Sequence, residues 1–195
     1  MKTIGLTGSL AMGKSTTAKM FADENVPVFD ADAAVHELYE RGGRGADAVR
    51  AVLPDAVTAS GVDRGRLSQA VKSDPALLDK LEAAIHPLVR EMENRFRDAM
   101  RAAAVELVAF DIPLLFETGR EGEFDCIVVA SAPADVQMAR LMARPGMTGE
   151  WARLLLARQL PDVEKRRRAD FVVDTGKGFD FARDQVRMIV NHLRS

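Results

Sequence analysis

Residues 8–15 read GSLAMGKS, and this stretch decides the fold of the chain. It matches the phosphate-binding pattern G-x-x-x-x-G-K-[ST], with a strand-like run at 3–7 before it and a helix-competent run at 15–22 after it. Glycines permit the turns that point backbone N–H groups at a polyphosphate, and the following helix adds its positive N-terminal end. The alternative is an ordinary glycine-containing turn. The flanking strand and helix favour the phosphate-binding loop, so we expect a bound nucleoside triphosphate.

Two side chains of this loop carry specific chemistry. Lys14 can reach the β- and γ-phosphates, and the Ser15 hydroxyl can ligate the Mg²⁺ that bridges them. The residues predicted to contact the nucleotide in this stretch are Gly8, Ala11, Met12, Gly13, Lys14, Ser15 and Thr16.

Composition narrows the class of protein. The 195 residues carry 27 basic and 29 acidic side chains, so nucleic acid is not an expected partner. The one basic run, 165–168, is interpreted as a solvated helix end rather than a nucleic-acid patch. Cys126 is the only cysteine, which excludes an intrachain disulfide and predicts a small buried hydrophobe. No run has the length of a signal peptide or membrane span, so we expect a cytoplasmic protein without a membrane partner.

Short apolar runs alternate with longer helical patterns, which is typical of βαβ units and a parallel sheet. Strands are predicted at 2–7, 26–29, 105–110, 125–130 and 170–174. The expected fold class is α/β, a three-layer P-loop NTPase core with a five-stranded parallel sheet, a helical acceptor-binding insertion and an Arg-bearing lid. The single domain would comprise a core (about 1–35, 105–138 and 168–195), the insertion (about 36–104) and the lid (about 139–167).

The two excursions from the core have different patterns. In the insertion no strand is predicted, but apolar residues repeat at helical spacing over 85–103, which predicts a long amphipathic helix with Pro87 in its first turn. In the lid, arginines lie among helix formers that are broken at Pro145-Gly146, a candidate hinge. Such arginines are either solvent-facing or brought onto the transferring phosphoryl group. A last helix near 179–194 has an apolar face for the sheet.

A phosphate-binding loop alone does not separate a kinase from a GTPase or a motor. The guanine-specific N-K-x-D is absent and no D-x-x-G follows the third strand, which disfavours a GTPase, and the chain is small for a motor. A core with a helical insertion and an Arg-bearing lid fits a small-molecule kinase, which must cover both substrates and exclude water. A non-catalytic ATP-binding module is a further alternative.

Carboxylates follow the predicted second and third strands, where an open α/β sheet binds its ligands. Asp32 is favoured as the group that orients an acceptor hydroxyl and takes its proton, against the alternative that it caps a helix starting near Ala33. Asp30 is open between the two roles. Asp111 is a candidate Mg²⁺ ligand, with capping or structural hydrogen bonding as the alternative.

An ordered set of motifs resembles the dephospho-CoA kinase family along the whole chain. The matching pieces are GLTG at 5–8, DAD at 30–32, DRGRL at 63–67, LE at 81–82, IHP at 85–87, DIPLLFE at 111–117, RQ at 158–159, Lys165 and ADF at 169–171. Single pieces are weak, but their order is specific. Departures are the loop interior at 9–12, where the family usually has G-I-G-S, Thr175 in place of an asparagine, and Lys72 in place of a phenylalanine.

The resemblance implies transfer of the ATP γ-phosphoryl group to the ribose 3′-hydroxyl of dephospho-CoA, with Mg²⁺. It implies Asp32 as the base, Lys14 with Arg140 in catalysis, and Arg144 as a further lid contact to the nucleotide. Arg64 and His86 fall in the insertion that shapes the acceptor site, although a core histidine is an equal alternative for His86. The expected partners are ATP and dephospho-CoA, and the chain could be a monomer or a small homo-oligomer.

Overall fold

The computed structural model describes residues 1–195, which form two compact units. The first unit contains residues 1–29 and 100–195, and the second contains residues 30–99. The second unit corresponds closely to the predicted insertion. None of the helices combines the length and apolar composition that a bilayer crossing needs.

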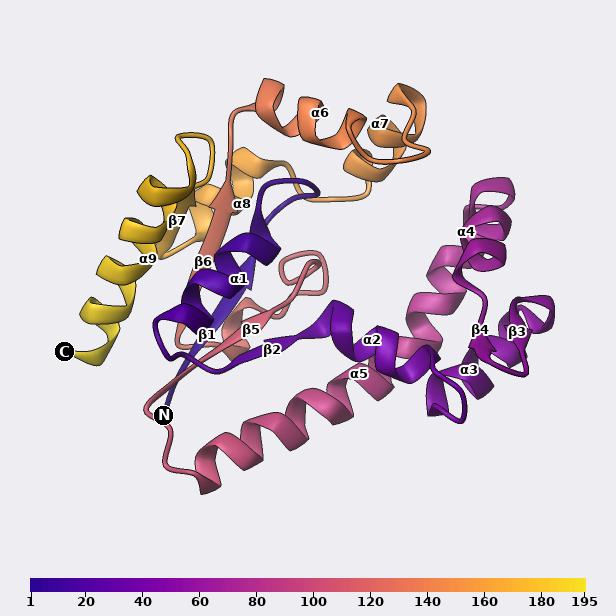
Figure 1. Ribbon diagram of the computed structural model, residues 1–195, viewed down its shortest axis with the longest axis horizontal. Coiled ribbons are helices and arrows are strands. Elements are labelled where there is room, and N and C mark those ends of the chain that lie inside the picture. Colours follow the sequence, from indigo (N-terminus) through magenta and orange to yellow (C-terminus); the bar gives the residue numbers. More distant parts are fainter. The chain divides into compact units, whose positions relative to one another are not determined.

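A five-stranded sheet forms the centre of the first unit (Figure 1). Its order is β2 (Val28–Asp30), β5 (Leu107–Asp111), β1 (Lys2–Thr7), β6 (Cys126–Ser131) and β7 (Phe171–Asp174). The pairs β1 with β5, β1 with β6 and β6 with β7 are parallel. All five predicted strands are confirmed within two residues of their expected starts. The carboxyl ends of these strands therefore share one edge of the sheet, where ligands bind in open α/β folds.

The core of this unit follows from the alternation of side chains along buried strands. One face packs against α1 (Lys14–Asp23) and α9 (Phe179–Arg194) and includes Ile4, Leu6 and Val186, all 0% exposed. On the other face, Phe110 packs against Phe124 with ring centroids 5.5 Å apart. The predicted last helix at 179–194 is confirmed as α9.

Three helices lie between β6 and β7, namely α6 (Ala134–Met142), α7 (Gly149–Ala157) and α8 (Asp162–Arg168). The expected break at Pro145-Gly146 separates α6 from α7, and Gly146 has a φ of 71°. The basic run 165–168 is the last turn of α8, as predicted, but Lys165 is 0% exposed. The expectation of a solvated run was therefore wrong for Lys165, because the Lys165 ammonium forms an ion pair with Glu117 inside the unit.

The second unit is mainly helical, as predicted. Its elements are α2 (Ala31–Tyr39), α3 (Arg44–Val52), the 3-10 turn Pro54–Ala56, β3 (Val57–Thr58), β4 (Gly61–Val62), α4 (Arg64–Ser73) and α5 (Ala76–Ala102). The antiparallel β3–β4 hairpin contradicts the expectation of no strand, and strands of two residues are too short to leave a periodic pattern. Pro87 lies inside α5 rather than in its first turn, because the helix already begins after Asp74, whose side chain accepts from Ala76 N at 3.1 Å.

Candidate active site

The loop between β1 and α1 contains two glycines whose surroundings leave little room for a side chain. A Cβ on Gly8 would lie 2.6 Å from the carbonyl oxygen of Ala130 in β6. Gly13 has a φ of 89°, a left-handed conformation that favours glycine, and a Cβ there would lie 2.9 Å from Thr175 Oγ1. Close approach and backbone conformation thus explain both fixed glycines of the phosphate-binding pattern.

Lys14 and Asp111 meet where the two central strands end. Lys14 Nζ donates to Asp111 Oδ1 at 2.5 Å, and the two side chains are only 11% and 1% exposed. Asp111 is the last residue of β5 and pairs in register with Leu6 of β1. Turns rather than a helix follow Asp111, so it caps no helix. A lysine ammonium and a carboxylate are therefore held together at the ligand-binding edge of the sheet.

The first turn of α1 presents two further predicted residues, Ser15 and Thr16, both exposed. Mg²⁺ is usually bound by one or two protein oxygens and completes its octahedral shell with water and phosphate oxygens. The structure contains no cluster of three or more His, Cys, Asp or Glu side chains that would make a closed protein cage. The Ser15 hydroxyl and the Asp111 carboxylate fit the smaller donor set that a nucleotide-bound Mg²⁺ takes.

The interior of the loop makes a turn that ordinarily favours glycine. Met12 N donates to Ser9 O at 3.1 Å, and Ala11, the third residue of this turn, has a φ of 63°. Among residues other than glycine, only Ala11, Asn25 and Ala104 have positive φ. Negative φ at Leu10 followed by positive φ at Ala11 is the pattern of a type II turn, which prefers glycine at its third position. Ala11 therefore adopts the conformation in spite of its side chain.

Two glutamines from the predicted lid and its flank bind this turn. Gln159 Oε1 accepts from Leu10 N at 2.8 Å, and Gln137 Nε2 donates to Leu10 O at 2.8 Å. Gln137 lies in α6, and Gln159 follows α7. The sequence alone predicts no role for either glutamine. Gln137 and Gln159 lie 127 and 149 residues from Leu10, and only the folded chain brings them into contact with it.

Arg140 also reaches the loop, both through Thr175 and by a long hydrogen bond to Ala11 O at 3.5 Å. The Arg140 guanidinium donates to Thr175 O at 2.8 Å and to Thr175 Oγ1 at 3.0 Å, and Thr175 Oγ1 donates to Met12 O at 2.7 Å. Thr175 thus braces the loop. Arg144, two residues beyond the end of α6, is exposed. The two predicted lid arginines therefore have different surroundings.

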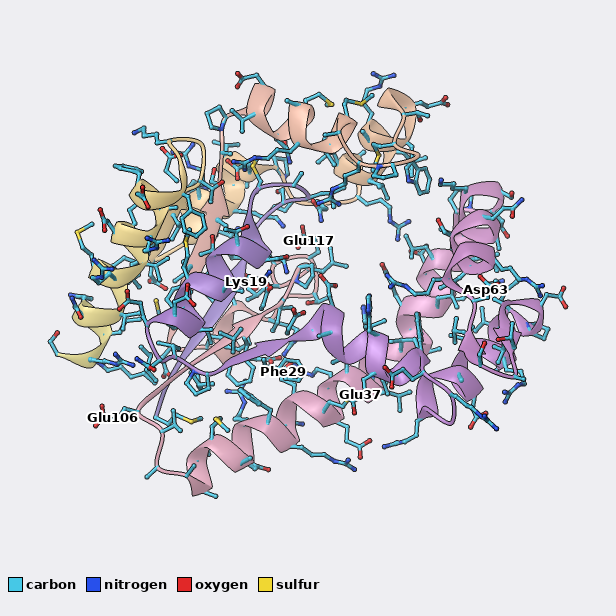
Figure 2. All side chains as sticks on the ribbon, viewed as in Figure 1. Lys19, Phe29, Glu37, Asp63, Glu106 and Glu117 are labelled. Carbon is cyan, nitrogen blue, oxygen red and sulfur yellow. The ribbon has the colours of Figure 1, made fainter.

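A buried ion pair lies next to the Gln159 contact. Lys165 Nζ is 2.8 Å from Glu117 Oε1, with side chains 0% and 15% exposed. The same Glu117 oxygen accepts from Leu160 N at 2.8 Å. Figure 2 shows Glu117 in the stretch that follows β5. The pair joins this stretch to α8 and to the residue next to Gln159.

In the second unit, Asp30 and Asp32 have separate roles in α2. Asp30 Oδ1 accepts from Ala33 N at 2.9 Å, so Asp30 is the N-cap of this helix. Asp32 lies in the first helical turn and is exposed. The capping alternative therefore holds for Asp30 and is excluded for Asp32.

The predicted acceptor-site residues also lie in the second unit. Arg64 is the first residue of α4, is exposed, and has Nη1 3.4 Å from His36 Nδ1 of α2. Burial raises the pKa of the neighbouring Tyr39, and the charge of Arg64 acts in the opposite direction. His86 is exposed on α5, so the alternative of a core histidine is wrong. His36 belongs to no motif, so the sequence predicts no role for it.

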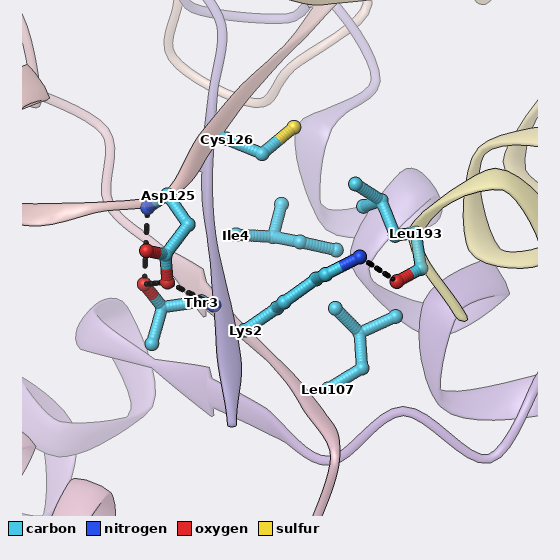
Figure 3. Close-up of a pocket in the computed structure, with 7 residues that line it drawn as sticks. All are labelled: Lys2, Thr3, Ile4, Leu107, Asp125, Cys126 and Leu193. Atoms are coloured by element: carbon cyan, nitrogen blue, oxygen red, sulfur yellow. Dashed lines mark hydrogen bonds between the residues drawn. The ribbon is translucent and has the colours of Figure 1, made fainter. Parts of the chain in front are cut away.

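A cavity of about 310 Å³ lies at the opposite edge of the sheet (Figure 3). Its lining residues are Lys2, Thr3, Ile4, Leu107, Asp125, Cys126 and Leu193. They come from the amino ends of β1, β5 and β6 and from the end of α9. Lys2 Nζ donates to Leu193 O at 2.7 Å, and Asp125 Oδ2 accepts from Thr3 N at 2.8 Å. Because this edge is remote from the phosphate-binding loop, the cavity is separate from the candidate active site.

Known proteins similar to this chain agree on one family. A sequence model of the dephospho-CoA kinase family matches residues 2–180. The chain is 52% identical over 194 residues to a dephospho-CoA kinase of Mesorhizobium japonicum, covering 100% of this chain and 98% of that relative. It is 50% identical over 193 residues to one of Brucella melitensis, covering 99% and 96%.

Solved structures support the same fold. TT1252 from Thermus thermophilus is similar with a TM-score of 0.78 and 33% identity, covering 98% of this chain and 96% of that one. A dephospho-CoA kinase from Campylobacter jejuni has a TM-score of 0.66 at 20% identity, covering 98% and 97%. A shikimate kinase from Acinetobacter baumannii has a TM-score of 0.56 at 16% identity, covering 99% and 93%. At these lower identities the likeness concerns the fold, which these P-loop kinases share.

Proposed function

This chain belongs to the dephospho-CoA kinase family, and from that premise we propose how its own residues carry out the reaction. The reaction is ATP-dependent phosphorylation of the ribose 3′-hydroxyl of dephospho-CoA, which gives CoA and ADP in the final step of coenzyme A synthesis. The chain is thus a phosphotransferase with an alcohol as acceptor. The assignment of residues depends mainly on the ion pair between Lys14 and Asp111 at the loop between β1 and α1.

The triphosphate binds in this loop. Lys14 binds the β- and γ-phosphates, and the N-terminal end of α1 adds backbone N–H groups and a favourable dipole. Ser15 and Asp111 would hold Mg²⁺, Asp111 directly or through water. When bound, the ion neutralises charge on the β- and γ-phosphate oxygens. Gly8, Ala11, Met12, Gly13 and Thr16 supply the surrounding contacts.

Asp32 orients the acceptor and receives its proton. The 3′ oxygen forms a bond to the γ phosphorus while the bond from that phosphorus to the bridging oxygen of ADP breaks, and the hydroxyl proton passes to the Asp32 carboxylate. The capping of α2 by Asp30 supports this role, because it shows that Asp32 is not the cap of this helix.

The remaining predicted residues bind the two substrates. Arg140 and Arg144 face charge on the phosphoryl group, with Arg140 also bracing the loop through Thr175. Arg64 and His86 contact dephospho-CoA in the helical insertion, and the exposure of both side chains supports this role. A cytoplasmic location remains a prediction from the sequence.

Substrate choice can be tested with a panel of acceptors. ATP consumption is measured with dephospho-CoA, adenosine, AMP and shikimate separately, and we expect turnover with dephospho-CoA. Turnover with another acceptor but not with dephospho-CoA would overturn the proposed reaction.

The Asp32→Asn variant tests the proposed base. We expect kcat to fall by about 100-fold or more, within the range that a positioned general base contributes. ATP affinity and melting temperature should be nearly unchanged, because Asp32 is exposed and is not the cap. The matched control is Asp30→Asn, since asparagine caps a helix about as well as aspartate. A near wild-type rate for Asp32→Asn would refute the role of Asp32.

A further inference from the structure

The turn of the phosphate-binding loop is held in an unfavourable backbone conformation by side chains from elsewhere in the unit. Ala11 has a φ of 63° in a turn closed by the bond from Met12 N to Ser9 O. Left-handed backbone is disfavoured for alanine because its Cβ approaches the following carbonyl oxygen. Such a conformation persists only where surrounding contacts specify it.

The contacts to Leu10 are suited to specify this conformation. The Leu10 carbonyl belongs to the peptide that precedes Ala11, so the direction of that carbonyl is coupled to the φ of Ala11. Gln137 Nε2 donates to this carbonyl at 2.8 Å, and Gln159 Oε1 accepts from the Leu10 N–H at 2.8 Å. The peptides on both sides of Leu10 are therefore fixed by side-chain amides.

Both glutamines are themselves firmly placed. Gln137 is buried in α6, with 8% of its surface exposed. Gln159 N donates to Leu156 O at 3.0 Å, and the next residue, Leu160, donates from its N–H to Glu117, which is paired with the fully buried Lys165. Because their own backbones are held in place, these two side chains can fix the conformation of the loop.

We propose that Gln159 is a positioning residue for ATP, which acts with Gln137 to hold the Leu10 peptides so that Ala11 keeps its left-handed conformation. This inference rests on the proposed binding of ATP in the loop. Gln159 lowers the dissociation constant for ATP by keeping the binding-competent loop populated, since apparent affinity falls with the fraction of competent protein. Loss of Gln159 should therefore matter more when residue 11 is alanine than when it is glycine.

The test is a double-mutant cycle between Gln159→Met and Ala11→Gly. Methionine keeps the length of the side chain but removes the amide. Calorimetric titration with Mg·ATP should give a Kd raised about tenfold by Gln159→Met in the Ala11 background, and by about threefold or less in the Ala11→Gly background. The Kd of Ala11→Gly alone is the reference for its own background, so that only the two ratios caused by Gln159→Met are compared.

A second alanine provides the matched control. Ala104 also has a positive φ, 54°, but lies between α5 and β5 rather than in the loop. The Ala104→Gly change should leave the tenfold effect of Gln159→Met intact. If the methionine variant does not fold, as judged by circular dichroism, Gln159→Ala replaces it in the same cycle.

The outcomes separate this inference from the proposed function. Equal losses of ATP affinity in the Ala11 and Ala11→Gly backgrounds, with wild type binding ATP, would overturn the positioning role alone. An unchanged Kd for Gln159→Met in the wild-type background would do the same. Absence of ATP binding by the wild-type chain would overturn the proposed function and this inference with it.

Discussion

One substitution can break the buried ion pair of Lys165 and Glu117 and leave a buried carboxylate without its counter-ion. Lys165→Met replaces the ammonium with an apolar group of similar length. Glu117, only 15% exposed, would keep the hydrogen bond from Leu160 N but lose its counter-ion. A buried charge without its partner retains its desolvation cost without the compensating attraction.

The size of the effect follows from this burial. Removing one partner of a buried pair costs about 3–5 kcal/mol, and the partial exposure of Glu117 favours the lower end, about 3 kcal/mol. With an unfolding entropy of about 2.1 cal/mol/K per residue, the 195 residues give about 0.4 kcal/mol/K. We therefore expect Lys165→Met to lower the melting temperature by about 7 °C.

Equilibrium unfolding in urea measures the change, followed by fluorescence of Trp151, the only tryptophan, which lies in α7 of the same unit. The double variant Lys165→Met with Glu117→Gln should recover more than half of the loss, because no buried charge remains and glutamine still accepts from Leu160. The control is Arg167→Met, which breaks a solvent-exposed pair with Glu164 in the same helix and should cost less than about 1 kcal/mol. A double variant as unstable as the sum of its parts would refute the argument.

Three further substitutions test the nucleotide site. Lys14→Ala should raise the Kd for ATP and nearly abolish turnover, and its melting temperature should fall by several degrees because the buried ion pair with Asp111 is broken; unchanged ATP affinity and rate would exclude the proposed role. Arg144→Lys should lower kcat by about tenfold with no change in melting temperature, whereas Arg140→Lys should lower both, since only Arg140 is bound to Thr175. An effect of Arg144→Lys confined to the KM for ATP would indicate ground-state binding instead.

The regular part of the fold was accessible from the sequence because its signals are local. Strands such as 126–131 are continuous apolar runs flanked by turn residues, and α9 carries an apolar stripe at helical spacing. The phosphate-binding loop is recognisable because its chemistry constrains consecutive residues. These features need no knowledge of distant contacts.

Features that depend on distant contacts could not be predicted. A run of four basic residues at 165–168 resembles a solvated helix end, and the burial of Lys165 is determined by Glu117, 48 positions earlier in the numbering. The contacts of Gln159 and Thr175 with the loop likewise join residues about 150 positions apart. His86 was placed correctly in a helix, but its exposure depends on which face of α5 the rest of the unit covers.

Because the chain has a single, buried cysteine, it is well suited to site-directed cysteine labelling. Burial, and secondarily the charges of Asp170 and Asp125, raise the pKa of Cys126 to about 12. Alkylating reagents attack the thiolate, which at pH 8 would amount to about one molecule in ten thousand for this group. A cysteine introduced at an exposed position such as Arg144 would therefore be the only site to accept a fluorophore or spin label. Movement of the segment between α6 and α7 could then be followed without first removing a native thiol.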